Sequence, residues 1–431
     1  MFHTIRNFLH VKEIRNKILF TLAMLFIFRI GTFIPVPGAD VSALSAMDQG
    51  AFGIFNFFGG GALENFSILA MGIMPYITAS IIVQLLQMDV IPKFAEWAKE
   101  GEVGRKKLAQ FTRYGTIVLG FIQAVGMSYG FNAQTGGMLI QDPNWSKYLL
   151  IALTLTAGTA FLMWLGEQIT SNGVGNGISI IIFGGIVAGM PSLFNQLYET
   201  LIKGAKDNLF INSAILVGIL LIVLIVVVGV VFIQQANRKV PVQYAKRVSG
   251  GDSKISTGAH NTHLPIKINA AGVIPVIFAS SFIMTPQTIA SFFNNDTARW
   301  IVENFKFSAP LGMLLYLILI IAFSYFYAFI QVNPQQIAEN LKKQGGYVPG
   351  IRPGKATQDY FSRVLARLTF VGALFLASIA ILPVILGKVF GLHESIQIGG
   401  TGLLIVVGVA LDTMKQLESQ LVKRNYKGFI K

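Results

Sequence analysis

Ten apolar stretches, each close to the length that a helix needs to cross a bilayer, dominate the chain. A bilayer core of about 30 Å is spanned by roughly 20 helical residues. Lipid offers the backbone no hydrogen-bond partner, so a segment that crosses it must be a helix or part of a closed barrel. The pattern predicts an all-α polytopic membrane protein with spans at 18–36, 69–87, 111–131, 148–166, 178–195, 211–233, 269–288, 311–331, 368–388 and 399–418.

Composition supports this fold class. Only 13% of the 431 residues are charged, whereas a typical soluble domain has about 25%. The stretch at 211–233 is the strongest, but four others are short or interrupted by Gly, Pro, Ser or Thr. Weak spans are usually shielded by protein. We therefore expect the strong spans at the periphery and the weak ones inside, namely 69–87, 178–195, 269–288 and 399–418.

The distribution of Lys and Arg predicts the orientation. When loops are assigned to alternating sides, one side holds 27 of the 34 basic residues and the other holds 6. Basic residues favour the cytoplasm, so both termini are predicted to be cytoplasmic, and the first span is expected to be retained rather than cleaved as a signal peptide. Five spans fall in each half, 1–208 and 209–431, which makes the halves inverted repeats with a path at their interface.

Patterns that suggest catalysis are incomplete. The chain has no cysteine, which excludes thiolate metal sites and disulfides. Gly126–Gly130 matches G-x-S-x-G, but no histidine lies in a span to act as the base. The stretch 350–357 lacks the first glycine of a phosphate loop, because Pro349 stands there. Gly185 and Gly189 predict a helix–helix contact. We expect no catalytic residue, metal or cofactor.

Ionisable residues inside spans mark ion pathways in transporters, and this chain has almost none. Asp89, Glu167 and Asp412 lie at cytoplasmic span ends, and Arg29 is the exception. Snorkelling or capping of carbonyl groups is the simpler interpretation of Arg29. The pattern favours a conduit over the alternative, an ion-coupled secondary transporter with inverted repeats.

Two long loops on the basic side, about 234–268 and 332–367, carry clustered positive charge. A topological or lipid-facing role explains any one of these residues equally well. Together with turn residues and tyrosines, the clusters predict a docking surface for nucleic acid phosphate or an acidic protein surface. Its candidate residues are Arg238, Lys239, Lys246, Arg247, Lys342, Lys343, Arg352 and Lys355.

The segment NFFGGGALENFS, at Asn56–Ser67, fits neither lipid nor an ordinary loop. It begins with aromatic residues, continues with three glycines and carries Glu64 and Asn65. It is too short to span a bilayer and too polar for lipid, while its glycines supply a flexible hinge. Such a segment suits a wet cavity inside the protein.

Long motifs run from about residue 15 to the C-terminus: FRIGTFIPVPG, GIMPYITASII, FLMWLGEQIT, GNGISIIIF, YAKR, THLPIKIN, AGVIP, NLKKQGGYVPGIRPG and GGTGLLIVV. They closely resemble the SecY family, the channel subunits of the bacterial protein translocase. The resemblance implies a non-enzymatic ten-helix pore in the plasma membrane. Such a pore passes unfolded secretory polypeptides and releases membrane segments sideways into lipid.

The resemblance also implies roles for particular residues. The family's plug is a short re-entrant helix that blocks the external funnel, here at about 55–68, and its residues are Asn56, Phe57, Phe58, Gly59, Gly60, Gly61, Ala62, Leu63, Glu64, Asn65, Phe66 and Ser67. A ring of apolar side chains forms the constriction. Ordinary core packing explains any single member, but coincidence in four weak spans favours a ring of Ile73, Ile77, Ile178, Ile182, Ile277 and Ile405.

The implied lateral gate lies between the second and third spans on one side and the seventh and eighth on the other. Arg352 matches the family's cytoplasmic-loop arginine, which is needed for the motor ATPase SecA and for ribosome docking. The implied partners are SecA, the ribosome, the small subunits SecE and SecG, signal sequences, unfolded polypeptides and membrane lipid.

Overall fold

The computed structural model describes residues 11–40, 56, 59–87, 91–140, 143–203, 209–244, 261–290, 293, 295–390 and 394–427. A helix occupies the place of every predicted span, which confirms the helical fold class. These helices are α2 (Lys12–Gly31), α5 (Met74–Leu86), α7 (Glu102–Gln134), α8 (Trp145–Asn172), α9 (Gly177–Tyr198), α10 (Leu209–Gln235), α11 (Ile274–Ala290), α13 (Pro310–Gln331), α15 (Lys355–Phe390) and α16 (Glu394–Lys427).

Length and apolar composition alone mark five of the described helices as able to cross a membrane, and α5 and α11 as shorter apolar helices. Shorter elements join them: α6 (Pro92–Lys99), the π-helical turn η1 (Glu199–Lys203), α12 (Asp296–Asn304) and α14 (Pro334–Lys343). Both short apolar helices belong to the spans that the sequence marks as weak. Their length agrees with shielding by neighbours, because a 13-residue helix cannot cross about 30 Å of lipid at 1.5 Å per residue.

The apolar character of a predicted span does not predict the buried fraction of every helix. In α10 only 11% of the most apolar window is buried, as expected for a peripheral helix. The expectation is wrong for 148–166, where 56% of the corresponding window of α8 is buried, and for 368–388, where 50% of the window of α15 is buried, against 33% for the weaker α9. The physical reason is close packing: α8 contacts α2, α7 and α9, and its glycines let neighbouring backbone approach.

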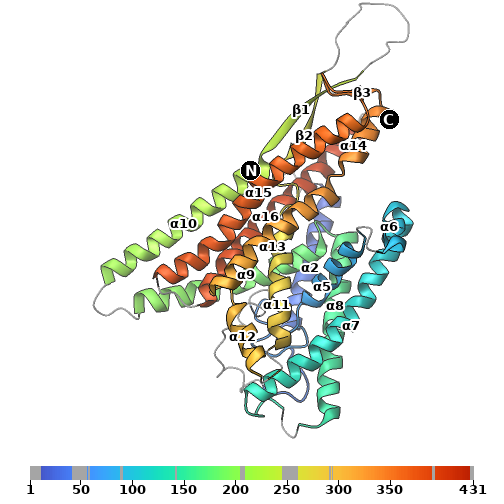
Figure 1. Cartoon of the computed structure of the whole chain (residues 1–431). Coiled ribbons are helices and arrows are strands. Elements are labelled where there is room, and N and C mark those ends of the chain that lie inside the picture. Colours follow the sequence, from blue (N-terminus) through green and yellow to red (C-terminus); the bar gives the residue numbers. More distant parts are fainter. Residues whose placement is uncertain are drawn as a thin grey trace, which may run out of the picture.

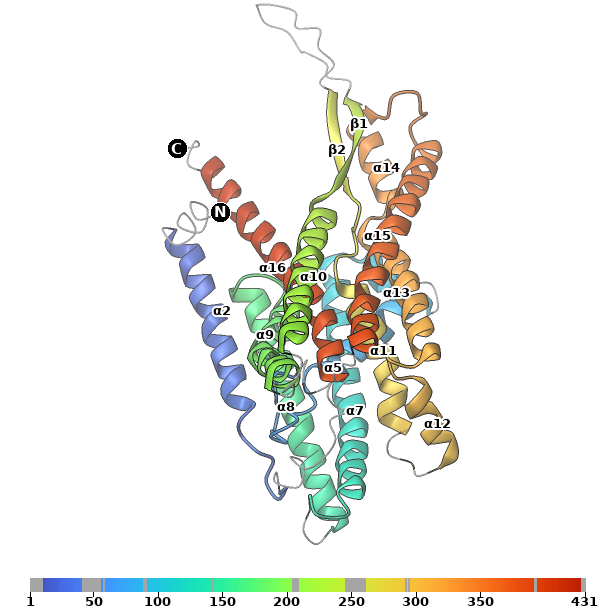
Figure 2. The same cartoon turned by 90° about the vertical axis from the view of Figure 1, so that its left-hand side faces the viewer.

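Several contacts join the two predicted halves, and two of them border the centre of the protein. On one side α9 packs against α16, and on the other α5 and α7 meet α11 (Figures 1 and 2). Each of these contacts joins a helix of the first five to a helix of the last five. The inverted relation of the halves and their boundary near residue 208 remain predictions.

A small sheet adds to the helical fold. Strands β1 (Asn237–Tyr244) and β2 (Asn261–Lys267) pair antiparallel, and β3 (Gly346–Tyr347) pairs with the other edge of β1, giving the order β2-β1-β3. Figure 2 shows the strands and α14 projecting from one end of the helices, with α12 at the opposite end. The helix α16 ends on the side of the strands, as the orientation predicted from basic residues requires.

The three largest apolar cores lie in different parts of the protein. The largest lies at the centre and includes side chains from α5, α8, α9, α11, α13, α15 and α16. A second core fills the space between α7, α8 and the irregular chain around residues 62–71, at the end of these helices away from the strands. A third core lies beneath the sheet and joins it to α14 and the start of α15.

Gly158 allows α8 to approach the irregular chain closely, and this contact yields a prediction. A Cβ at this position would lie 1.8 Å from the carbonyl oxygen of Ile68, whereas a Cβ at Gly218 on α10 would meet nothing within 4 Å. Gly158→Ala is therefore expected to destabilise the protein by about 1–3 kcal/mol through overpacking. Gly218→Ala is the matched control. Thermal unfolding in detergent measures the difference, and equal midpoints for the two variants would contradict this packing.

Candidate functional site

Residues 59–73, which precede α5, lie in the centre of the protein as turns rather than as regular secondary structure. Asn56 is helical, Phe57 and Phe58 lie outside the described residues, and Gly59–Ser67 forms successive turns rather than the predicted short helix. Gly60 and Gly61 have φ values of 66° and 86°, a region that glycine adopts without steric cost. We call residues 56–67 the predicted plug.

The C-terminal end of the predicted plug is fixed to the chain that follows α2. The amide of Val36 donates to the carbonyl oxygen of Phe66, and the amide of Ile68 to that of Ile34, both at 2.9 Å. The side chain of Asn65 adds a bond of 3.2 Å to the carbonyl oxygen of Thr32. These bonds satisfy backbone groups that would otherwise be buried without partners.

Apolar side chains of the predicted plug enter two different cores. Ala62 belongs to the central core, whereas Leu63 and Phe66 belong to the second core, where the Phe66 ring packs edge-on against Phe131 with centroids 6.1 Å apart. Glu64 is exposed and its backbone and side chain bond to the side chain of Asn56. Thus the segment buries its apolar side and leaves its carboxylate in the open.

Gly185 on α9 makes a contact that the sequence did not predict. The Gly185/Gly189 pair predicted a helix–helix contact, which stays a prediction, and Gly185 also lies against the predicted plug. A Cβ on Gly60 would stand 3.0 Å from the Cα of Gly185, so two glycine backbones touch. The absence of both side chains is what lets the segment lie against α9.

Four of the six predicted ring residues surround one small cavity at the centre. Its lining includes Ile73, Ile77, Ile182 and Ile277, together with Gly59 of the predicted plug. The cavity offers about 10 Å³ to the centre of a water-sized sphere, and roughly 10–15 Å³ is needed to hold one water. Apart from Ser280, its lining side chains are apolar and offer a water few hydrogen-bond partners.

The other two ring candidates lie nearby but do not line this cavity. Ile405 on α16 is fully buried in the same central core. Ile178 packs at the edge of that core, with its side chain against Gly166 of α8. All six isoleucines therefore lie in or against the central core, and four of them line the cavity.

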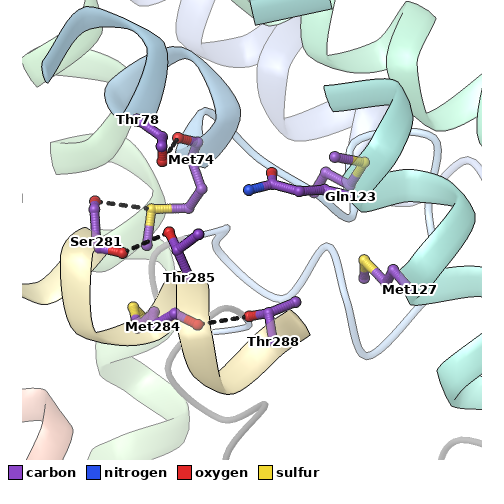
Figure 3. A pocket seen from close by; sticks show the side chains of 9 residues that line it. Met74, Thr78, Gln123, Met127, Ser281, Met284, Thr285 and Thr288 are labelled. Carbon is purple, nitrogen blue, oxygen red and sulfur yellow. Dashed lines mark hydrogen bonds between the residues drawn. The ribbon is translucent and has the colours of Figure 1, made fainter. Parts of the chain in front are cut away.

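A second cavity lies where α11 meets α5 and α7. Figure 3 shows Met74 on α5 pointing toward Ser281 on α11, with Gln123 and Met127 facing them from α7. The Oγ of Ser281 and the Sδ of Met74 are 3.6 Å apart. The remaining lining residues are further methionines and threonines, namely Met71, Thr78, Met284, Thr285 and Thr288. This boundary is thus closed by flexible or small polar side chains.

The described parts of the two basic loops join in one surface. Strand β3 from the second loop pairs with β1 from the first, and the hydroxyl of Tyr347 donates to the side chain of Gln243 at 2.9 Å. Val240 and Val242 of β1 point into the third core with Leu341 of α14. These strands are not among the elements predicted from the sequence. Buried and exposed residues nevertheless alternate at Val240, Pro241 and Val242 of β1, which is the pattern typical of a strand.

Positive charge covers this surface. Lys246 and Arg247 lie outside the described residues, while six predicted docking residues are exposed: Arg238, Lys239, Lys342, Lys343, Arg352 and Lys355. None of the six pairs with a carboxylate within the described parts of the chain.

The backbone on either side of Arg352 is held. Ile351 donates to the carbonyl oxygen of Val348 at 3.0 Å, and the hydroxyl of Thr357 donates to that of Arg352 at 2.8 Å. The guanidinium therefore stands on an ordered turn.

The structure also shows the contacts of Ser128 and Arg29, whose roles the sequence left open. Ser128, in the G-x-S-x-G pattern, is buried and donates to the carbonyl oxygen of Val125 at 2.9 Å, as expected for helix packing. Arg29 lies in the last turn of α2 and donates to the carbonyl oxygen of Gly60. Sequence reasoning missed this partner, because a backbone carbonyl 31 positions away carries no sequence signal.

Comparisons with known proteins place this geometry in a family. The family model described as SecY matches residues 67–414. A relative from Bacillus licheniformis, a protein translocase subunit SecY, is 66% identical and aligns over 100% of both chains.

Two solved structures share the fold. One describes how the plug domain of the SecY protein stabilises the closed state of the translocation channel and maintains a membrane seal; its TM-score is 0.62 at 21% identity, covering 97% of this chain and 95% of that one. The other is Sec61 in the canine ribosome–channel complex from the endoplasmic reticulum, with a TM-score of 0.60 at 19% identity and the same coverage.

Proposed function

The chain belongs to the SecY family, and from this premise we propose that the cavity between its isoleucines is the closed constriction through which polypeptides pass. The protein is a protein-conducting channel subunit of the Sec translocase and is not itself an enzyme. Family membership sets aside the alternative of an ion-coupled secondary transporter.

The observation that carries the proposal is the small, mainly apolar cavity itself. Ile73 and Ile77 from the α5 end, Ile182 from α9 and Ile277 from α11 meet around a space about the size of one water. An apolar constriction of this size excludes ions because it offers no group to replace their hydration shell. Since the lining comes from three helices, separating them widens the opening without unfolding any of them.

The stiffness of isoleucine suits this role. Side chains branched at Cβ are restricted at χ1, so they form a constriction of defined shape. An extended polypeptide pushes the helices apart, and the side chains close behind it. In this proposal the predicted plug is the second seal, since Gly59 lines the same cavity and Leu63 and Phe66 fill the core beyond it.

We assign the lateral gate to the boundary of α5 and α7 with α11 and, behind it, α13. Methionine is unbranched and adapts to many partners, so Met74, Met127 and Met284 can repack against signal sequences of different shape. The hydrogen bond that Ser281 on α11 donates to Met74 on α5 has a sulfur acceptor and is therefore weak. This interface therefore separates at lower cost than the tightly packed glycine contacts of α8.

The basic surface formed by β1, β3, α14 and the turn at Arg352 is the proposed docking site for the driving partner. The backbone around Arg352 is already held by hydrogen bonds, so binding there does not also have to order the backbone. Phosphate of ribosomal RNA or acidic side chains of the motor SecA have the matching charge. SecE and SecG are expected in the complex. The protein spans the membrane several times, and we place it in the plasma membrane with both termini cytoplasmic.

The seal yields the first test. Replacing Ile73, Ile77, Ile182 and Ile277 together with Ser lets water and ions enter the constriction, so the conductance of resting channels in planar bilayers is expected to rise several-fold. The matched control carries the same four changes at exposed positions of the outer surface, namely Ile117, Ile122, Ile225 and Ile318. Conductance as low as that of the control would refute the seal.

The gate yields the second test. The protein has no native cysteine, so Met74→Cys with Ser281→Cys introduces a single possible disulfide where the native side chains are 3.6 Å apart. Oxidation is expected to stop release of membrane segments into lipid, and reductant is expected to restore it. Each single cysteine variant, treated identically, is the control. The cross-link is verified on non-reducing gels after cleavage between α5 and α11, and normal insertion by the cross-linked protein would show that these helices do not separate.

The docking surface yields the third test. Arg352→Glu replaces a donor with a repelling charge on an exposed turn, and each lost bond to a charged group is worth about 1.5–3 kcal/mol. SecA affinity is therefore expected to fall about tenfold or more, with unchanged folding. Arg299→Glu, at an exposed arginine of α12 on the opposite end, is the matched control. Equal SecA affinity of the two variants would exclude Arg352 from the docking site.

A further inference from the structure

The predicted plug is attached at its two ends in different ways. Near Phe66 it is held by the backbone bonds to residues 34–36 and by the bond from Asn65 to Thr32. At Gly59–Gly61 it turns back toward α2 and α9. In the described chain, the bond from Arg29 to Gly60 is the single hydrogen bond that reaches these three glycines from outside the segment.

Arg29 is well placed to hold this glycine turn. It lies in the last turn of α2, where unpaired carbonyl groups favour a cation. Its guanidinium also stands 4.7 Å from the centre of the Phe33 ring, and one nitrogen is 3.5 Å from the hydroxyl of Thr32. These contacts fix the side chain before it reaches Gly60, which lowers the entropy lost in forming the bond.

The other side of Gly60 is a contact of backbone with backbone. The glycine lies against Gly185 of α9, so the segment is confined between α9 and the Arg29 guanidinium. A contact between two glycines offers only dispersion forces, which are small for so few atoms. The directional part of the attachment therefore comes from Arg29.

We propose that Arg29 is a positioning residue that latches the glycine turn of the plug to α2, so that opening the channel requires breaking the Arg29–Gly60 bond. The base near Phe66 acts as the fixed pivot and the glycine turn as the moving end. The expected consequence of the latch, a tighter seal, rests on the proposed function. The Arg29–Gly60 contact itself does not depend on that function.

The chemistry of the latch suits a reversible movement. A bond from a cation to a neutral carbonyl is stronger than a neutral pair, yet breaking it exposes one charge instead of two. An arginine–carboxylate pair in the same place would leave both charges unpaired, at a much larger cost. Glu64, the carboxylate of the segment, bonds to Asn56 instead of Arg29.

Thiol accessibility tests the latch without relying on transport. Ala62 and Ser67 are both fully buried, and the protein has no native cysteine. Ala62→Cys reports on the moving end, and Ser67→Cys reports on the pivot. Each is placed in the complete translocase in proteoliposomes, and its rate of reaction with a small maleimide is measured. A buried thiol reacts through transient opening, so the rate follows the opening equilibrium.

The variants are Arg29→Met, which removes the donor, and Arg29→Lys, which keeps a cation. We expect Arg29→Met to raise the reaction rate at Ala62→Cys about tenfold, corresponding to about 1.4 kcal/mol in the opening equilibrium, and to leave Ser67→Cys unchanged. Arg29→Lys is expected to restore most of the protection. Arg15→Met, at the exposed opposite end of α2, is the matched control.

Three results would overturn the latch. One is an unchanged rate at Ala62→Cys in Arg29→Met. Another is equal acceleration at both cysteines, which indicates general destabilisation of the protein. The third is an equal rate in the Lys and Met variants, because the latch requires a cationic donor. Resting conductance is recorded on the same samples: faster labelling with unchanged conductance would keep the latch and refute the sealing role of the segment.

Discussion

The structure depends on how an irregular backbone is accommodated inside a membrane protein. Residues 59–73 form turns at the centre of the helices, where lipid cannot satisfy their polar groups. Residues 32–36 supply part of the required partners, and Arg29 supplies another. Surrounding helices must therefore leave room and must bring small residues to the contact, which explains Gly158 on α8 and Gly185 on α9.

The same segment connects the two membrane cores. Ala62 packs in the central core beside the isoleucines, and four positions later Phe66 is fully buried in the core between α7 and α8. Displacing the segment consequently disturbs both cores at once. Since Phe66 holds a φ of 38° that non-glycine residues rarely adopt, the pivot is fixed by its surroundings rather than by local preference.

The sequence predicted the helices well, because hydrophobic length is a direct physical requirement of the bilayer. It predicted the burial of α8 wrongly, since hydropathy is blind to the close approach that Gly158 permits. The strands went unnoticed because Pro241 and several basic residues masked the alternation of Val240 and Val242. The ring residues came from motif resemblance, and the meeting of four of them around one cavity depends on tertiary packing that no single stretch encodes.

The constriction is lined by stiff side chains, whereas the gate is filled by flexible or small ones. Isoleucine, stiff at χ1, surrounds the axial cavity, while methionine and threonine fill the boundary of α5 and α7 with α11. Both cavities share Met71 and Met74, so α5 borders each of them. A movement of α5 away from α11 therefore loosens the gate and widens the constriction together. The adaptable side chains take up varied apolar segments, and the stiff ones restore one closed shape when α5 returns.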